Sequence, residues 1–331
     1  MNNIYLSKVT DSDDKKIYDS TKKILNKFEE EMVFQNEIPL KVHFGEEGNS
    51  TFIEPKKYKG IIDYLKSKNI KSKFLETNVL YRGRRTKSQE HKNLAIEHGF
   101  TELPIEISNG FENVDINLKH FNKCKIGKEF SKYKQIIVIS HFKGHYLTGF
   151  GGAIKQLAMG FASRSGKLDM HSGSKPLLNP LKCKKCDLCS KKCPENAIEI
   201  GRLLPRINSN CIGCAGCIAF CPNNAILINW LGGIGKNFNE KLAEYALASQ
   251  KNKENIYFNF VMKVTRGCDC VGRNMKTITP DIGILASKDP VALDKASIDL
   301  LEKYKKFRGK KILDYSEKIG LGNKRYKIIE I

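Results

Sequence analysis

The sequence predicts an α/β protein whose mostly parallel sheet is interrupted by a small α+β domain. Two observations support this fold class. Short apolar segments alternate with segments of helical length before and after a cysteine-rich stretch, and such alternation is typical of a parallel sheet covered by helices. The stretch itself holds eight of the chain's eleven cysteines in two copies of one spacing. That arrangement is typical of a small domain held together by metal centres.

The elements expected before the cysteine-rich stretch follow from apolar periodicity and from residues that begin or end helices. Ile61, Ile62 and Leu65 share one face of a helix that Pro55 begins, and Gly99 ends the next helix. In chain order we expect a helix at Thr21–Glu31, a strand at Leu40–Phe44, a helix at Pro55–Lys68, a strand at Ser72–Leu75, a helix at Thr86–His98, a strand at Gln135–Ser140 and a helix at Ala153–Ala162.

The elements expected after the stretch complete the same sheet and its helices. Ile256–Val264 and Ile282–Ser287 are apolar and of strand length, and Pro290–Tyr304 is an amphipathic helix with Asp289 as its cap. The α/β body is therefore expected at residues 1–175 and 232–331, and the inserted domain at residues 176–231.

The cysteines of the stretch follow the pattern Cys-x-x-Cys-x-x-Cys-x-x-x-Cys-Pro twice. This is the spacing of bacterial ferredoxins with two 4Fe–4S clusters, in which the fourth cysteine of each run ligates the other cluster. Zinc sites usually show two separated Cys-x-x-Cys pairs, and disulfides need an oxidising compartment, so both alternatives fit less well. The expected ligands are Cys183, Cys186, Cys189 and Cys221 for the first cluster, and Cys211, Cys214, Cys217 and Cys193 for the second.

The two runs are copies of one unit, because they repeat at an offset of 28 residues and both continue into Cys-Pro-x-Asn-Ala-Ile. Each copy is expected to form a cluster loop, a short helix and a strand, with Ala197, Ile198, Ala225 and Ile226 against the clusters. Lysines interleave with the first run, whereas apolar residues, Ile212 among them, interleave with the second. Nearby positive charge favours a reduced cluster, so the first cluster is expected to be easier to reduce.

Polar side chains follow several of the predicted strands, and in parallel sheets such residues gather at one edge. A catalytic site at this edge is therefore one interpretation of the pattern. Free cysteines are also common core residues, so the two cysteines of the Cys-x-Cys sequence have a second, structural interpretation. The candidate residues are His43, His141, His145, Cys268, Cys270 and Asp289.

A glycine-rich segment precedes the helix expected at Ala153–Ala162. Gly149, Gly151 and Gly152, together with Lys143, are candidates for a small anion site, because glycines free the backbone N–H groups at a helix start. The alternative is a tight turn between strand and helix. We also expect this segment to face the Cys268 and Cys270 pair across one crevice, where an anionic or metal-bearing ligand would bind.

The chain carries 57 basic and 36 acidic residues, a net charge of +21 at pH 7. Such a charge attracts acidic partners, an acidic redox protein among them, although a lysine-rich composition alone also explains it. The sequence has no recognised nucleic-acid-binding motif, no apolar run long enough to cross a membrane and no secretory signal. We expect a cytoplasmic protein of an organism living with little oxygen, with a redox partner and a small ligand rather than a membrane or nucleic acid.

Over nearly its full length the sequence resembles the iron–sulfur centre proteins called domain of unknown function 362, with an inserted two-cluster ferredoxin unit. The matching stretches are KVHFGEEGN from Lys41, ETNVLYRGRR from Glu76, HFKGHYLTGFGGAIKQLAMGFASRSGK from His141, both cysteine runs, RGCDCVG from Arg266 and DIGILASKDPVALDKASIDL from Asp281. The resemblance implies an α/β body split by the ferredoxin unit, and it implies no particular reaction.

Three functions agree with these observations. The leading hypothesis is an electron-transfer protein that binds two 4Fe–4S clusters and exchanges electrons with a partner or with a ligand in the α/β body. The second is a cluster-dependent reductase whose active site lies in the α/β crevice. The third is a structural or sensing role for the clusters.

Overall fold

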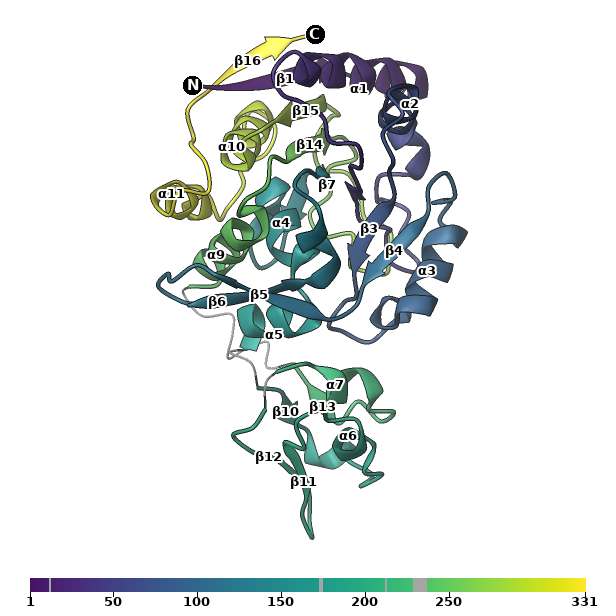
Figure 1. Cartoon of the computed structure of the whole chain (residues 1–331), viewed down its shortest axis with the longest axis vertical. Coiled ribbons are helices and arrows are strands. Elements are labelled where there is room, and N and C mark those ends of the chain that lie inside the picture. The colour runs from purple at the N-terminus through teal and green to yellow at the C-terminus, as the bar shows by residue number, and fades with distance from the viewer. Residues whose placement is uncertain (12, 173–174, 212, 229–236) are drawn as a thin grey trace.

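The computed structural model describes residues 1–11, 13–172, 175–211, 213–228 and 237–331. Its larger part is built on an eight-stranded sheet with the order β16-β1-β15-β14-β7-β2-β3-β4. A smaller lobe hangs below this body (Figure 1). The strands of the sheet are β1 (Asn2–Lys8), β2 (Leu40–Lys41), β3 (Phe74–Thr77), β4 (Ile105–Ser108), β7 (Ile137–His141), β14 (Ile256–Val261), β15 (Gly283–Ser287) and β16 (Tyr326–Glu330).

Helices cover both faces of the sheet, as Figure 1 shows. One face is covered by α1 (Asp14–Glu29), α2 (Lys59–Ser67) and α3 (Ser88–Glu97), and the other by α4 (Ala153–Phe161), α9 (Phe238–Gln250), α10 (Pro290–Leu301) and α11 (Lys311–Lys318). Because successive strand side chains point to opposite faces, each central strand feeds two cores. On β7, Ile137 and Ile139 pack with the first helix group and Val138 with the second.

The prediction of an α/β fold with a mostly parallel sheet is confirmed, with one strand reversed. β15 pairs antiparallel with both of its neighbours, β1 and β14, whereas the other neighbouring strands of the sheet pair in parallel. The carboxyl ends of β2, β3, β7 and β14 therefore lie at one edge, and the carboxyl end of β15 lies at the opposite edge.

The lobe contains two small antiparallel sheets and two short helices. The pairs are β10 (Leu177–Leu178) with β13 (Ile226–Leu227) and β11 (Ile198–Ile200) with β12 (Pro205–Ile207), and the helices are α6 (Leu188–Lys191) and α7 (Gly216–Phe220). The expected domain boundary between residues 231 and 232, and Ile212, lie outside the described residues.

Several elements differ from expectation. α1 begins at Asp14 rather than Thr21, because the Asp13 side chain accepts hydrogen bonds from the backbone N–H groups of Lys15 and Lys16. The hairpins β5–β6 (Phe111–Asp115, Lys123–Gly127) and β8–β9 (Lys143–His145, Gly149–Gly151) and the helix α5 (Arg164–Ser172) are additional elements. Within the described ranges, no helix combines the length and the apolar stretch that a membrane crossing requires.

Candidate functional site

The lobe brings its eight regularly spaced cysteines into two groups, each around a small cavity. One cavity has a volume of about 20 Å³ and is lined by four cysteines, Cys183, Cys186, Cys189 and Cys221. The other also has a volume of about 20 Å³ and is lined by Cys193, Cys211, Cys214 and Cys217. The fourth cysteine of each run thus lies beside the other run, which is the crossed arrangement that the spacing predicts.

The backbone around the two groups repeats at the same offset as the sequence. Positive φ angles recur at Lys185 (51°) and Gly213 (70°), at Asp187 (58°) and Ala215 (58°), and at Asn196 (49°) and Asn224 (50°). The N–H of Ala197 donates to Cys193 Sγ at 3.2 Å, and the N–H of Ala225 donates to Cys221 Sγ at 3.2 Å. Thiolates that receive backbone N–H bonds around a shared space fit an iron–sulfur cluster, because those bonds stabilise its negative charge.

The second cysteine group lies at the contact between the lobe and the body. Leu80 and Leu168 of the body belong to the same apolar cluster as Cys217 and Ile218 of α7. In Figure 1, α7 forms the top of the lobe beneath α5. The lobe is also held by Arg82 of the body, which donates to Pro222 O at 3.2 Å and to Asn224 Oδ1 at 3.0 Å.

The expected contrast in charge between the two cysteine groups needs a correction. Arg164 of α5, a residue outside the cysteine stretch, lies close enough to Cys214 and Cys217 for their charges to act on it, although burial lowers its pKa. The second group therefore has a partly buried cation, whereas lysines near the first group, such as Lys184 and Lys191, are exposed to solvent. The potential difference expected from the lysines is reduced by this arginine, because exposed charges are screened more strongly.

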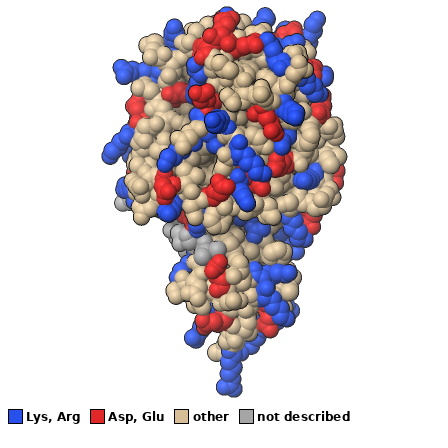
Figure 2. Space-filling view, viewed as in Figure 1, with Lys and Arg blue, Asp and Glu red and all other residues tan. Residues whose placement is uncertain are grey.

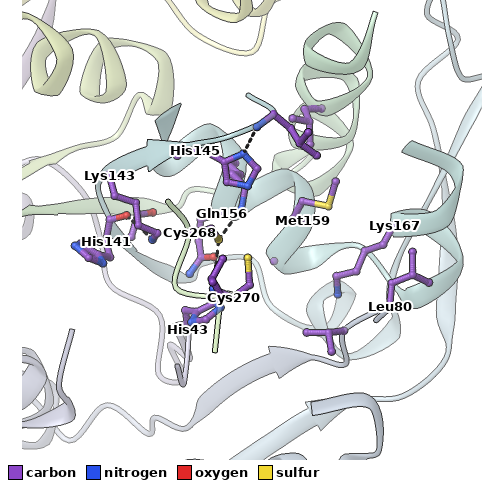
Figure 3. Close-up of a pocket in the computed structure, with 18 of the residues that line it drawn as sticks. His43, Leu80, His141, Lys143, His145, Gln156, Met159, Lys167, Cys268 and Cys270 are labelled. Atoms are coloured by element: carbon purple, nitrogen blue, oxygen red, sulfur yellow. Dashed lines mark hydrogen bonds between the residues drawn. The ribbon is translucent and has the colours of Figure 1, made fainter. Parts of the chain in front are cut away.

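The body contains a pocket of about 330 Å³ at the carboxyl ends of its parallel strands. Figure 3 shows the Cys-x-Cys residues and His145 near one another, with Lys167 and Leu80 at the other end of the pocket. Leu80 lines this pocket and also packs against the lobe. The predicted crevice residues His43, His141, Lys143, His145, Gly151, Gly152, Cys268 and Cys270 all contribute to its lining, as does Lys155 of α4.

Cys268 and Cys270 lie in a tight turn rather than in an extended segment. The N–H of Val271 donates to Cys268 O at 3.0 Å, which closes the turn, and the N–H of Cys270 donates to Cys268 Sγ at 3.5 Å. Both sulfur atoms and a ring nitrogen of His145 lie within 4.8 Å of one another. Lys155 of α4 donates to Cys268 Sγ at 3.7 Å. The expectation that the cysteines and the glycine-rich segment share one pocket agrees with this placement.

The protonation of these groups follows from their contacts. A hydrogen bond from the thiol of Cys270 holds the pKa of Cys268 well below its ordinary value, with the charge of Lys155 acting in the same direction, although burial opposes them. The same hydrogen bond raises the pKa of Cys270. Burial and the charge of Lys155 lower the pKa of His145. The turn therefore favours deprotonation of Cys268 over deprotonation of Cys270.

His141 supports the cysteine turn and does not present a free nitrogen to the pocket. Its Nδ1 lies 3.0 Å from both carboxylate oxygens of Asp269, and its Nε2 lies 2.9 Å from Met262 O. Lys143 Nζ lies 2.7 Å from the same carboxylate. Burial alone would raise the pKa of Asp269, but the charges of His141 and Lys143 lower it. Both histidine nitrogens face acceptors, so His141 cannot act as a base while it holds Asp269.

The start of α4 is not an anion site, which corrects the interpretation of Gly149, Gly151, Gly152 and Lys143. The N–H groups of Ala153 and Ile154 donate to the Asp294 carboxylate at 2.7 and 3.0 Å. The chain's own buried carboxylate thus takes the place of an external anion. Gly152 permits this contact, because a Cβ there would lie 2.2 Å from Asp294 Oδ1.

Asp289 lies at the opposite edge of the sheet from the pocket, so its assignment to the crevice is wrong. It follows β15, the one reversed strand, and its side chain accepts hydrogen bonds from Val291 N, Ala292 N and Asn323 N. Its role as the cap of α10 agrees with the prediction. A sequence that alternates strands and helices gives no sign of one reversed strand.

His43 lines the pocket beside a buried arginine. Its Nε2 lies 3.0 Å from Arg85 Nη1, and its Nδ1 accepts the N–H of Gly45 at 3.0 Å. Burial and then the charge of Arg85 lower the pKa of His43 well below its ordinary value. His43 is therefore neutral. Its one acceptor nitrogen, Nδ1, is taken by Gly45, so His43 contributes no charge to the pocket.

Buried charged residues at the far end of the pocket were not expected from the sequence. Lys41 Nζ lies 2.9 Å from Glu76, and both side chains are buried. Lys167 donates to Thr77 Oγ1, Asn78 O and Ala162 O at 2.5, 2.7 and 3.0 Å. Burial lowers the pKa of Lys167 to about 7. The one signal in the sequence is a lysine and a glutamate within apolar strands, at Lys41 and Glu76.

Comparisons with known proteins give a family and two solved structures of low similarity. A protein from Thermotoga maritima solved by structural genomics is 12% identical with a TM-score of 0.42, over 94% of this chain and 60% of that one. The lactate racemase apoprotein from Thermoanaerobacterium thermosaccharolyticum is 12% identical with a TM-score of 0.43, over 93% of this chain and 58% of that one. The chain thus spans about three-fifths of their length.

A comparison with curated proteins found no match. The family model described as "Domain of unknown function (DUF362)" matches residues 38–299, which include the pocket of the body and both cysteine runs. The chain therefore belongs to the DUF362 family.

Proposed function

We propose that this chain is an electron-transfer protein that binds two 4Fe–4S clusters in an inserted domain at residues 176–231 and passes electrons to a ligand in the pocket of the body. The observation that carries the proposal is the grouping of the eight cysteines into two crossed sets of four, each around its own cavity. Clusters bound there would supply electrons one at a time.

The route into the body is supported by the position of the second cysteine group. Cys217 packs in the apolar cluster that contains Leu80, and Leu80 lines the pocket. The first group lies further out in the lobe, where Cys186 is exposed. The proposed order is therefore from an external donor to the first group, then to the second group, then to the pocket.

The surface of the lobe supports docking of an acidic donor. Its exposed basic residues are Lys175, Lys182, Lys184, Lys185, Lys191, Lys192, Arg202 and Arg206, whereas Asp187, Glu195 and Glu199 are its acidic residues. Figure 2 shows basic side chains along one side of the lobe and at its tip. A positive surface around the first cysteine group favours encounter with a negatively charged redox protein.

A cluster-dependent reductase is the second candidate, and the charge of the pocket favours it. The half-buried Lys155 and the buried Lys167 place two amino groups on the pocket wall, and neither makes an ion pair with a carboxylate among the described residues. A small anionic ligand would complement them. In this version the ligand is a substrate, and the body supplies orientation and charge stabilisation.

Paired cysteine substitutions test the crossed ligand sets. Anaerobically prepared protein is expected to contain about eight iron and eight sulfide ions per chain. Cys183→Ala with Cys221→Ala removes two ligands of one cluster and should leave one intact 4Fe–4S cluster. Cys211→Ala with Cys221→Ala removes one ligand from each cluster and should leave no intact one. Spin quantification of the reduced protein by electron paramagnetic resonance counts the intact clusters.

The control is Cys124→Ala, which removes a buried cysteine of β6 that belongs to neither group. It should leave the iron and sulfide content unchanged. If the two double variants exchange their results, each run ligates its own cluster and the crossed assignment is wrong. Iron near four per chain, or stoichiometric zinc, would contradict the two-cluster proposal itself.

A further inference from the structure

The Cys268–Asp269–Cys270 turn has a chemistry that electron delivery to the pocket does not by itself require. We propose that Cys268 and Cys270 are a redox-active pair that cycles between a disulfide and a dithiol. The pair would accept two electrons, delivered one at a time, and pass both to the ligand in the pocket. This inference rests on the proposed function, since the electrons arrive through the cysteine-rich lobe.

The turn places the two sulfur atoms where a bond between them can form. The hydrogen bond from Val271 N to Cys268 O, at 3.0 Å, curls the backbone so that both side chains lie on one side. Their sulfur atoms are within 4.8 Å of each other. A disulfide needs Cα atoms about 4.4–6.8 Å apart, a separation that residues i and i+2 of a tight turn reach.

Three groups stabilise the thiolate that reduction releases at Cys268. The ammonium group of Lys155 lies 3.7 Å from its sulfur, and the N–H of Cys270 donates to it at 3.5 Å. His145 also donates a hydrogen bond to this sulfur, which contributes to the lowered pKa of Cys268. A stabilised thiolate leaves more readily during thiol–disulfide chemistry and favours the reduced form of the pair.

The hydrogen bonds of His145 argue against a metal ion at the same residues. One imidazole and two thiolates would suit zinc with an open fourth position. However, His145 Nδ1 accepts the N–H groups of Leu147 and Thr148 at 3.3 and 3.2 Å. The hydrogen of the neutral ring is therefore on Nε2, the nitrogen that a metal would need. The ammonium group of Lys155 beside Cys268 also disfavours a second cation there.

The surroundings hold the turn in place while the sulfur atoms move. Asp269, between the two cysteines, is fully buried and fixed by His141 and Lys143. Asn49 donates to Val271 O at 2.9 Å, just after the turn. Bond formation then requires only side-chain rotation at Cys268 and Cys270, so the backbone of the pocket wall keeps its shape in both states.

The S–S bond between Cys268 and Cys270 takes up two electrons and one proton and breaks, giving a thiolate at Cys268 and a thiol at Cys270. Two reduced 4Fe–4S clusters in the lobe, at one electron each, are the reductant. Reoxidation by a two-electron acceptor bound in the pocket returns both electrons, releases the proton from Cys270 and forms the S–S bond again.

Quantitative alkylation after acid quenching tests the pair directly. Trypsin releases Gly267–Arg273, a peptide whose two cysteines are Cys268 and Cys270. Anaerobic protein is poised at a series of potentials, quenched, denatured and treated with N-ethylmaleimide, and the peptide is weighed by mass spectrometry. We expect no adduct at high potential and two adducts at low potential. The ratio of the two forms should change tenfold per about 30 mV, the slope of a two-electron couple.

Variants and a second readout separate this inference from the proposed function. Cys270→Ser should leave one cysteine in the peptide that is alkylated at every potential, while the iron content and the cluster signal stay unchanged. Cys124→Ala, which leaves the peptide intact, should preserve the two-electron transition. Lys155→Gln, which removes the cation beside Cys268, should shift the midpoint so that the pair is harder to reduce.

The outcomes are distinct. If the protein contains its clusters but the peptide is doubly alkylated at every potential, the pair is not redox-active and the inference fails, while the proposed function stands. Zinc bound in stoichiometric amount, and lost in Cys270→Ser and His145→Ala, would also overturn the inference. A two-electron transition in protein that lacks iron would support the redox pair and contradict the proposed function.

Discussion

Single buried carboxylates decide the chemistry of several positions around the pocket, and Asp294 is the clearest case. Its carboxylate accepts hydrogen bonds from Ala153 N, Ile154 N and Asn259 Nδ2. Burial nevertheless raises its pKa to about 6, with the nearby charge of Asp289 acting in the same direction. The folded protein therefore binds a proton at Asp294 more tightly than the unfolded chain does.

This raised pKa predicts that Asp294 contributes stability at low pH that is lost as the pH rises through about 6. Between about pH 5 and pH 7 the contribution should fall by about 1 kcal/mol. Asp294→Asn has no titrating group at this position. The melting temperature of the natural protein minus that of this variant should therefore decrease as the pH rises. Thermal unfolding of anaerobic protein at several pH values measures that difference. A difference that grows instead would mean that the three donors stabilise the carboxylate more than burial opposes it.

Residues were predictable from the sequence where their chemistry depends on local spacing. The cysteine sets follow from short intervals, and the cap role of Asp289 follows from the proline after it. Asp294 and Lys167 were not predictable, because their partners are distant in sequence. Asp294 of α10 reaches the start of α4, and Lys167 of α5 reaches Thr77 of β3, only in the folded protein. His141 illustrates a partial success, since its place beside the pocket follows from the strand before it but its partner Asp269 does not.

At the scale of elements, the start of α4 contacts the end of β7 and α10, and the helix also lines the pocket. Gly152 precedes the helix, and a Cβ at this position would lie 2.2 Å from Asp294 Oδ1 and 2.9 Å from Phe142. Lys155 of the same helix reaches the cysteine turn. The position of α4 therefore couples the packing of the body to the geometry of the pocket.

Gly152→Ala is expected to destabilise the protein by about 1–3 kcal/mol, because the added methyl group overpacks a buried contact. Gly151→Ala is the matched control, since its Cβ would meet only the flexible side chain of Lys155, at 3.1 Å. Denaturant unfolding of anaerobic protein compares the two variants. Equal losses in both would show that the close approach to Asp294 does not limit the size of residue 152.

Elements with long apolar segments were the predictable ones, and those with short or edge strands were not. The predicted bounds of β7, β14 and α10 lie within three residues of the observed ones, because a buried segment needs a continuous apolar run. β1 and β16 pair at the sheet edge, where polar residues interrupt the apolar pattern. The strands of the β8–β9 hairpin have three residues each, which is too short for a pattern. The direction of β15 depends on the 262–282 connection, which contains the cysteine turn and has no helical signal.

At the scale of the whole molecule, charge is unevenly placed relative to the proposed electron route. The exposed lysines near the first cysteine group lie where an acidic donor would dock, and the pocket opens in the body. Figure 2 also shows acidic side chains mixed with basic ones over the body, whereas basic side chains gather along one side of the lobe and at its tip. Long-range attraction should therefore orient an acidic partner toward the lobe.

The rate of reduction by an acidic ferredoxin is expected to fall as ionic strength rises, because the screening length is about 10 Å at 0.1 M salt and shorter above it. Lys184→Glu with Lys191→Glu should lower the rate at low salt and reduce its dependence on salt. Lys303→Glu with Lys306→Glu changes the net charge equally on the body and is the control. Stopped-flow absorbance follows the reaction. Equal effects of both pairs would place the docking surface elsewhere.

The order of the strands has a consequence for how the protein is made. β14 and β15 follow the lobe in the sequence, yet they lie between β7 and β1 in the sheet. β1 therefore has no neighbour to pair with until β15 emerges, at Gly283–Ser287, and its other neighbour, β16, follows at Tyr326–Glu330. The lobe emerges while the sheet is still incomplete. If the lobe binds clusters as proposed, iron and sulfide would reach its cysteines before Leu80 and Leu168 pack against them, and cluster assembly during synthesis would not require the finished body to open.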